Sequence, residues 1–255
     1  MDRTHPALTT EHFDAVLFDL DGVLTETASI HAAAWREMFD GFLRQQAKDQ
    51  GETFVPFDID ADYRAYVDGK PRYDGVRSFL MSRGIELPEG DTGDPVTANT
   101  VTGLGNRKNQ LMAELIEDNG VEAFPGAVRL VEALRGRGVK TAVVSSSANA
   151  RAVLGAAGIS DLFDARVDGA VSAELRLPGK PAPDAFLEAA RRLDAPPDRA
   201  VVVEDAISGV QAGRSGGFAL VVGVGGSERT QTLLDNGADL VVADLGELLD
   251  LGRSV

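Results

Sequence analysis

Asp19 and Asp21 are the residues whose types and spacing first suggest chemistry. They follow an apolar run at residues 13–18, and Gly22 comes directly after them. The apolar run predicts a buried parallel strand, and ligands bind at the carboxyl ends of such strands in open α/β sheets. Glycine lets the backbone turn freely at that point. The Asp-x-Asp-Gly sequence therefore predicts a catalytic or binding loop; a solvated turn is the ordinary alternative.

Two further polar clusters follow predicted strands later in the chain. Each begins where an apolar run ends: Ser145, Ser146 and Ser147 after residues 139–144, and Glu204 and Asp205 after residues 200–203. Because the carboxyl ends of parallel strands meet at one edge of a sheet, we expect these side chains to share a crevice with the first aspartates. Taken separately, each cluster could simply cap the helix that follows it.

Phosphoryl transfer is the chemistry that these side chains fit. Asp19, Glu204 and Asp205 would crowd three negative charges together, and Mg²⁺ relieves such repulsion through oxygen ligands. The metal would also neutralise phosphate oxygens and orient the phosphorus for in-line attack. Ser145 can donate to the phosphate beside backbone N–H groups at the next helix start. Lys180, in a Gly-Lys-Pro sequence, could add positive charge, although a lysine in such a loop is ordinarily exposed.

The composition limits the classes of function. A net charge of −15 argues against a general nucleic-acid binder, so an anionic substrate would need a cation and well-placed basic residues. The absence of cysteine excludes disulfides, thiolate catalysis and cysteine-based zinc sites. No apolar run approaches the ~18 residues of a membrane span, and residues 1–10 lack the apolar core of a signal peptide. We therefore expect a cytoplasmic enzyme with a small-molecule substrate and no nucleic-acid or membrane partner.

The elements that must position these residues alternate between strand and helix, with one long interruption. Residues 1–12 are expected to be a disordered lead-in. No β-like segment occurs between residues 25 and 138, and Gly and Pro break this helical block at residues 68–71. The predicted strands are 13–18, 139–144, 163–167, 200–203, 218–222 and 239–242, and the predicted helices are 29–48, 60–67, 72–83, 101 to 117 or 119, 125–137, 149–157, 181–193, 206–214, 228–236 and 244–250.

Such alternation predicts an α/β fold with a doubly wound, parallel, Rossmann-like sheet. The helical block would be an all-helical cap domain inserted after the first strand. We place the core domain at residues 1–27 and 123–255 and the cap domain at residues 28–122. A chain of 255 residues is long enough for a core domain and a smaller second one.

Four of these features, taken in chain order, resemble the four motifs of the haloacid dehalogenase superfamily: Asp19-x-Asp21, Ser145, Lys180 and Glu204-Asp205. The resemblance covers nearly the whole chain, and Asp at the second carboxylate position is typical of phosphatase-type members. It implies that Asp19 is the nucleophile that forms an aspartyl-phosphate. Asp21 would be the general acid and base for the leaving and incoming oxygens. The implied Mg²⁺ ligands are Asp19, the Asp21 backbone carbonyl and Asp205, with Glu204 close by, and the implied phosphate-binding residues are Ser145, Ser146 and Lys180.

Within that superfamily the chain is most similar to the beta-phosphoglucomutase subfamily. Four segments carry this similarity: residues 19–27, which His31 and Trp35 follow, and residues 106–109, 180–184 and 204–212. The similarity implies conversion of beta-glucose 1-phosphate to glucose 6-phosphate through a bound 1,6-bisphosphate, under a cap that closes and excludes water. The subfamily has a lysine where this chain has Ala148. The substrate-binding residues that it implies are His31, Gly69, Arg72, Lys108, Asn109, Ser147 and Asn149.

The cap residues also have non-functional interpretations. His31 could be an ordinary surface histidine, Trp35 on the same helix face a packing residue, and Lys108 and Asn109 a solvated helix face. Arg72 at a helix start is unfavourable for the helix dipole, which favours an anion there. For the whole protein, two alternatives stay open: a sugar-phosphate phosphatase with the same nucleophile, and an inactive binding module. We expect a monomer in every case.

Overall fold

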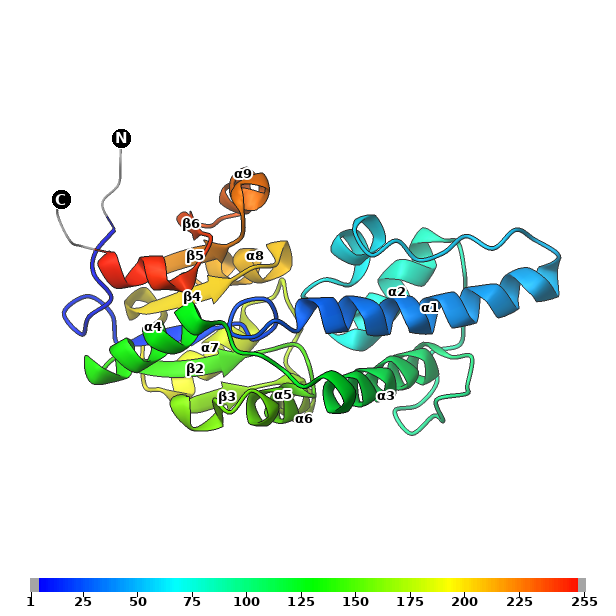
Figure 1. Ribbon diagram of the computed structural model, residues 1–255, viewed down its shortest axis with the longest axis horizontal. Helices are drawn as coiled ribbons and strands as arrows, with labels where there is room; N and C mark the ends of the chain where they lie inside the picture. Colours follow the sequence, from blue (N-terminus) through cyan, green and yellow to red (C-terminus); the bar gives the residue numbers. More distant parts are fainter. Residues whose placement is uncertain (1–4, 252–255) are drawn as a thin grey trace. The chain divides into compact units, whose positions relative to one another are not determined.

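The chain folds into two compact units in the computed structural model, which describes residues 5–251 (Figure 1). The first unit combines Met1–Glu26 with Val121–Val255, and the second is Thr27–Gly120. The second unit is therefore inserted into the sequence of the first, between β1 (Ala15–Phe18) and β2 (Lys140–Val144). No helix in residues 5–251 is both long and apolar enough to cross a bilayer.

The described residues of the first unit form a six-stranded parallel sheet with the order β3-β2-β1-β4-β5-β6. β1 lies between β2 and β4, and Phe18 is level with Val143 on one side and Val203 on the other. The other strands are β3 (Ala165–Val167), β4 (Ala200–Glu204), β5 (Leu220–Val224) and β6 (Leu240–Val242). The predicted parallel sheet is confirmed.

Helices cover both faces of this sheet (Figure 1). From β1 the chain winds outward to β2 and β3 and then reverses, crossing to β4 and winding outward to β5 and β6. Because parallel crossovers are right-handed, this reversal places the two sets of connecting helices on opposite faces. The first set is α4 (Pro125–Gly136) and α5 (Ala150–Ala156), and the second is α7 (Asp184–Arg192), α8 (Ile207–Ser215) and α9 (Ser227–Asp235). The sheet is thus doubly wound, and ligands bind in such sheets where the winding reverses, here between the carboxyl ends of β1 and β4.

One apolar core of the first unit lies on the face covered by α7 and α8. Leu17 and Val202 of the central strands pack there with Phe186 of α7 and Val210 of α8, and all four are buried. Phe18, which points to the opposite face, is also fully buried. Both faces of β1 are covered, which explains why its sequence is continuously apolar rather than alternating.

The second unit, every residue of which the structure describes, consists of helices and loops without a strand. Its elements are α1 (Ala28–Gln50), the short π-helix η1 (Tyr63–Val67), α2 (Arg72–Ser82) and α3 (Val101–Asn119). Phe39 lies at the centre of its core, with ring centroids 5.3 Å from Trp35, 5.2 Å from Phe57 and 4.1 Å from Phe79. The packing interpretation of Trp35 is therefore confirmed.

Two local predictions about the first unit are incorrect or incomplete. Residues 1–4 of the predicted disordered lead-in lie outside the described residues, but residues 5–12 belong to the first unit, and residues 8–12 form bends and turns. Leu8 is fully buried, and its carbonyl accepts a hydrogen bond from Arg137 at 3.2 Å. Asp168 caps the unpredicted helix α6 (Gly169–Leu175), since its carboxylate accepts from two backbone N–H groups of the first turn. In each case a single residue, Leu8 or Asp168, fixes the local structure, and one residue does not produce a periodic pattern in the sequence.

Candidate active site

Asp19 lies one residue beyond β1, at the point where the winding of the sheet reverses. Its backbone N–H donates to the Val203 carbonyl at 2.9 Å, which extends the pairing of β1 with β4. Its side chain is almost completely buried, and Glu204, the last residue of β4, is fully buried. The strand register therefore brings these two carboxylates together, as the sequence predicts.

Lys180 lies between these two carboxylates. Its Nζ donates to Asp19 Oδ1 at 2.5 Å and also to Glu204 Oε1. The residue is only 4% exposed, and its ammonium lies 5.0 Å from the centre of the Phe186 ring. The interpretation of Lys180 as an exposed loop lysine is therefore wrong, because the side chain is a buried cation.

The crowding of charges shifts the pKa values of this cluster. Burial raises the pKa of the Asp19 carboxyl well above its usual value; Lys180 opposes this rise, while Glu204, Asp21 and Asp205 add to it. Burial alone would lower the pKa of Lys180, but Asp19 and Glu204 together outweigh burial and hold that pKa above its usual value. Lys180 therefore stays charged, and its single positive charge faces several carboxylates.

Asp205 completes a set of three carboxylates that could hold a metal ion. Asp19, Glu204 and Asp205 each offer an oxygen, and these oxygens lie within 4.8 Å of one another. The set contains only oxygen donors, which suits a hard divalent cation. Gly22 makes the close approach possible, since it has a φ of 85° and a Cβ there would lie 2.5 Å from Asp205 Oδ2. The residues therefore fit a magnesium site both in chemistry and in spacing.

Arg229 of α9 is a residue of this site that the sequence did not predict. Its Nη2 donates to the backbone carbonyl of Asp205 at 2.6 Å, and its Nη1 lies 3.5 Å from Asp205 Oδ2. Arg229 thereby restrains one of the candidate metal ligands. In the sequence it looks like any arginine on a polar helix face, and only the fold brings it to Asp205.

The serine cluster lies beside Asp21. Ser145 Oγ donates to Asp21 Oδ2 at 3.2 Å and accepts from the Ser147 backbone N–H at 3.0 Å. Ser147 Oγ accepts in turn from the Asn149 backbone N–H at 3.1 Å. These two hydroxyls therefore satisfy backbone groups of the loop ahead of α5, but no side chain caps α5 itself, so the capping interpretation is wrong for the serines. Ser145 also contacts the second aspartate.

Gly169 holds the backbone of this serine loop in place. Its N–H donates to the Ser147 carbonyl at 3.0 Å. A Cβ on Gly169 would lie 2.6 Å from the Ser146 carbonyl oxygen and 2.8 Å from the Ala148 nitrogen, closer than packed atoms approach. Only glycine fits there, so the start of α6 fixes the loop that carries the predicted phosphate-binding serines.

Gly209 of α8 has the corresponding role for Glu204. Glu204 Oε2 accepts from the Ala206 N–H at 2.8 Å, so this carboxylate binds both the backbone just ahead of α8 and Lys180. A Cβ on Gly209 would lie 1.8 Å from Glu204 Oε1. No buried glutamate can keep its position against such a contact.

We expect Gly209→Ala to reduce turnover by about 100-fold or more, because Glu204 must leave its contact with Lys180. The free energy of unfolding should fall by about 2–4 kcal/mol as the buried carboxylate loses its partners. Steady-state kinetics and urea unfolding measure both effects. Gly155→Ala in α5 is the matched control, since a Cβ there meets nothing within 4 Å and alanine favours helix. Equal activity of the two variants would contradict this role of Gly209.

Four of the predicted substrate-binding residues form two pairs within the second unit. Lys108 Nζ of α3 lies 2.9 Å from His31 Nδ1 of α1. Arg72 Nη1 at the start of α2 donates to Asn109 Oδ1 of α3 at 3.1 Å. Lys108 is buried, so the solvated-face interpretation is wrong for this residue. Packing of α1 on α3 thus brings the first pair into contact, and packing of α2 on α3 brings the second pair into contact.

Gly69 lies in the loop between η1 and α2 that the sequence predicts from its Gly and Pro residues. Its φ is 69°, in the left-handed region that favours glycine. The loop ends at Pro71, and α2 begins at Arg72 without a side-chain cap. The backbone conformation at this position therefore favours glycine, independently of any contact with a substrate.

The model of a family described as haloacid dehalogenase-like hydrolase matches residues 13–217. A curated protein of Mycobacterium bovis named beta-phosphoglucomutase is 54% identical over 242 residues, which cover 94% of this chain and 92% of the relative. The Bacillus subtilis protein of the same name is 36% identical, over 92% of this chain and 91% of the relative. The crystal structure of a beta-phosphoglucomutase from Clostridium difficile has a TM-score of 0.72 and 28% identity, over 92% of this chain and 93% of that chain.

Proposed function

Because the chain belongs to the haloacid dehalogenase-like hydrolase family, we propose that it transfers a phosphoryl group through an aspartyl-phosphate on Asp19. The observation that carries this proposal is the meeting of Asp19, Glu204 and Lys180 where the winding of the sheet reverses. We propose further that it is a beta-phosphoglucomutase, converting beta-glucose 1-phosphate to glucose 6-phosphate through beta-glucose 1,6-bisphosphate. Its 54% identity to a protein of that name over most of both chains supports this.

In this proposal Mg²⁺ is the cofactor, held by Asp19, the backbone carbonyl of Asp21 and Asp205, with Glu204 beside them. The three clustered carboxylates and the excess of negative charge around Lys180 support this assignment. When bound, the metal would neutralise phosphate oxygens and relieve the repulsion among the carboxylates.

The residues of the chain divide the chemistry between them. An Asp19 carboxylate oxygen bonds to the phosphorus while the bond from phosphorus to the sugar oxygen breaks. Asp21 gives its proton to that leaving oxygen, and in the second half-reaction it takes the proton from the sugar hydroxyl that attacks the aspartyl-phosphate. Ser145, Ser146 and Lys180 hold the transferring phosphoryl group. The hydrogen bond from Ser145 to Asp21 supports a shared role for these two residues.

The second unit acts in this proposal as a substrate-binding cap inserted into a catalytic core. Its contribution is His31, Gly69, Arg72, Lys108 and Asn109, which act with Ser147 and Asn149 of the first unit on the sugar and the second phosphate. A buried lysine and an ordered arginine give this unit the positive charge that an anionic substrate needs. A cytoplasmic location and a monomeric state stay predictions, and size-exclusion chromatography would test the second.

A sugar-phosphate phosphatase with the same nucleophile is the second candidate function. The observation that favours it is Ala148, which stands where the beta-phosphoglucomutase subfamily has a lysine. A missing positive charge would weaken the hold on a second phosphate. Water would then compete with the sugar hydroxyl for the aspartyl-phosphate.

One assay separates the two functions. The protein receives beta-glucose 1-phosphate, Mg²⁺ and a trace of beta-glucose 1,6-bisphosphate, and both glucose 6-phosphate and inorganic phosphate are measured. A mutase yields glucose 6-phosphate without matching release of phosphate. One phosphate released for each substrate consumed would instead establish the phosphatase, and the absence of any turnover would favour an inactive binding module.

A further inference from the structure

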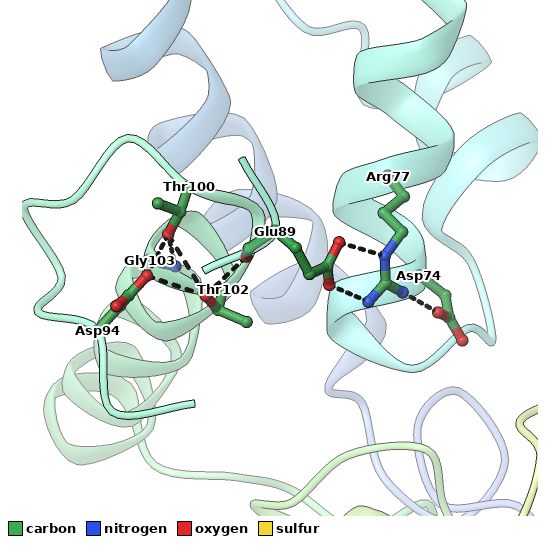
Figure 2. Close-up of polar contacts among 7 residues, drawn as sticks. All are labelled: Asp74, Arg77, Glu89, Asp94, Thr100, Thr102 and Gly103. Carbon is green, nitrogen blue, oxygen red and sulfur yellow. Dashed lines mark hydrogen bonds and ion pairs between the residues drawn. The ribbon is translucent and has the colours of Figure 1, made fainter. Parts of the chain in front are cut away.

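Residues 85–100, which we call the anchored loop, contain no helix or strand and yet are tied to α3 by side-chain hydrogen bonds (Figure 2). Thr100 caps α3 by accepting from the Gly103 N–H at 2.9 Å, and it donates to Asp94 Oδ2 at 2.6 Å. Thr102 lies 2.9 Å from the Glu89 carbonyl and 3.1 Å from Asp94 Oδ2. Two distant parts of the loop therefore meet at the first turn of α3.

The anchored loop is also tied to α2. Arg77 of α2 donates through Nε to Glu89 Oε2 at 3.1 Å, and its other nitrogens pair with Glu89 and with Asp74 (Figure 2). These groups are partly exposed, so each pair contributes modestly to stability. These pairs matter for position, because they fix one end of the loop to α2, the helix that begins with Arg72.

Two glycines allow the anchored loop to fit closely against itself and α3. A Cβ on Gly103 would lie 2.4 Å from the Ala98 carbonyl oxygen. A Cβ on Gly90, whose φ is 76°, would lie 2.1 Å from Asp94 Oδ2. Larger residues would push the loop away at both places. The loop is therefore a fitted part of the fold rather than a slack connection.

A chain of hydrogen bonds leads from the anchored loop to Arg72. Asn106 Nδ2 donates to the backbone carbonyls of Thr92 at 3.1 Å and Asp94 at 2.9 Å. The Tyr73 hydroxyl donates to Asn106 Oδ1 at 2.9 Å, and Arg72 Nη2 donates to the Tyr73 hydroxyl at 2.9 Å. Each group on this path is hydrogen-bonded to the next, so the orientation of one side chain restrains that of its neighbour.

The Tyr73 ring supports Arg72 by packing as well. The guanidinium carbon lies 4.7 Å from the centre of the ring. The ring lies against the backbone of α3 at Gly105, where a Cβ would come within 2.6 Å of Tyr73 Cδ1. With Asn109 holding the other terminal nitrogen, Arg72 is restrained on three sides. A free arginine side chain would have to be ordered each time a ligand binds.

We propose that Tyr73 and Asn106 are positioning residues. They connect the anchored loop to Arg72 by hydrogen bonds, hold the Arg72 guanidinium in one orientation and thereby set the affinity for the substrate. This inference rests on the proposed function, in which Arg72 contacts the sugar phosphate. The two residues leave the charge of Arg72 unchanged and act only on its orientation. Truncating them should therefore weaken substrate binding rather than the chemistry at Asp19.

Tyr73→Phe is the direct test, since it removes one hydroxyl and keeps the ring beneath Arg72. We expect KM for beta-glucose 1-phosphate to rise about tenfold with kcat nearly unchanged, the size of effect that one hydrogen bond to a charged group supports. Acetyl phosphate carries no sugar for the cap to bind. The rate of phosphoryl transfer from acetyl phosphate to the enzyme should therefore stay at the wild-type value. Tyr66→Phe is the matched control, because Tyr66 packs on Phe79 in the same unit through its ring.

The double variant Tyr73→Phe/Asn106→Ala tests whether the two residues act through one path. If they do, its KM should be no higher than that of the worse single variant. An unchanged KM in Tyr73→Phe, additive effects in the double variant, or an equal loss with acetyl phosphate would each overturn the proposal. Failure of the proposed mutase would appear differently, as phosphate release by the wild type, and the KM comparison would then be made with that product.

Discussion

Replacing Asp19 with asparagine is expected to lower turnover of the sugar phosphate by about 10⁴-fold or more, because an amide cannot form the aspartyl-phosphate. The variant should stay folded. Burial raises the pKa of Asp19 well above its usual value, so the folded protein holds the ionised carboxyl at a cost, and a neutral amide of the same shape avoids that cost. Product formation and thermal unfolding, measured together, separate the loss of chemistry from a loss of structure.

Asp14→Asn is the matched control for this variant. Asp14 lies just ahead of β1, at its other end, and pairs with Arg199 at 2.8 Å. It undergoes the same chemical change as Asp19 within the same segment, and we expect its turnover to equal that of the wild type. Substantial turnover by Asp19→Asn would contradict the assignment of the nucleophile, whereas equal losses in both variants would indicate a general effect on the fold.

Replacing Lys180 with methionine is expected to have the second largest effect. It leaves the buried carboxylates of Asp19 and Glu204 without their shared cation. Breaking a buried ion pair on one side costs about 3–5 kcal/mol, so the free energy of unfolding should fall by about that amount. Turnover should fall by about 100- to 1000-fold, since a positive charge at the phosphoryl group is lost as well.

Adding Glu204→Gln to this variant separates the two effects. The second change removes one of the stranded charges, so it should restore part of the stability while turnover stays low. Lys140→Met, at the exposed first residue of β2, is the control for loss of a lysine and should change neither quantity much. A Lys180→Met variant as stable as the wild type would contradict the buried ion-pair network.

The sequence predicts well which edge of the sheet carries the candidate active site, because two regular patterns coincide there. Continuous apolar runs identify the central strands, and parallel pairing places Asp19, Ser145 and Glu204 at the same edge whatever the lengths of the connections. The positions of these residues therefore follow from the fold class. The structure refines the ends of the elements, such as α7 beginning at Asp184 rather than 181.

Other features depend on tertiary contacts that no local pattern contains. A Gly-Lys-Pro sequence is typical of an exposed loop, so the burial of Lys180 follows only from the meeting of β1, β4 and α7. Arg229 and Tyr73 resemble ordinary helix-surface residues. The contact of Arg229 with Asp205 joins two separate elements, and the contact of Tyr73 with its neighbour Arg72 depends on the direction of both side chains. Glycines such as Gly209 are visible in the sequence, but the atoms that exclude a side chain are not.

The most direct test of the central claim is to locate the phosphoryl group on the enzyme. The protein would be incubated with Mg²⁺ and acetyl phosphate, quenched in acid, digested and analysed by mass spectrometry. We predict one added phosphoryl group on the peptide that contains Asp19, and none there in the Asp19→Asn variant. A phosphoryl group on a different residue of the wild type, or its persistence in that variant, would contradict the account.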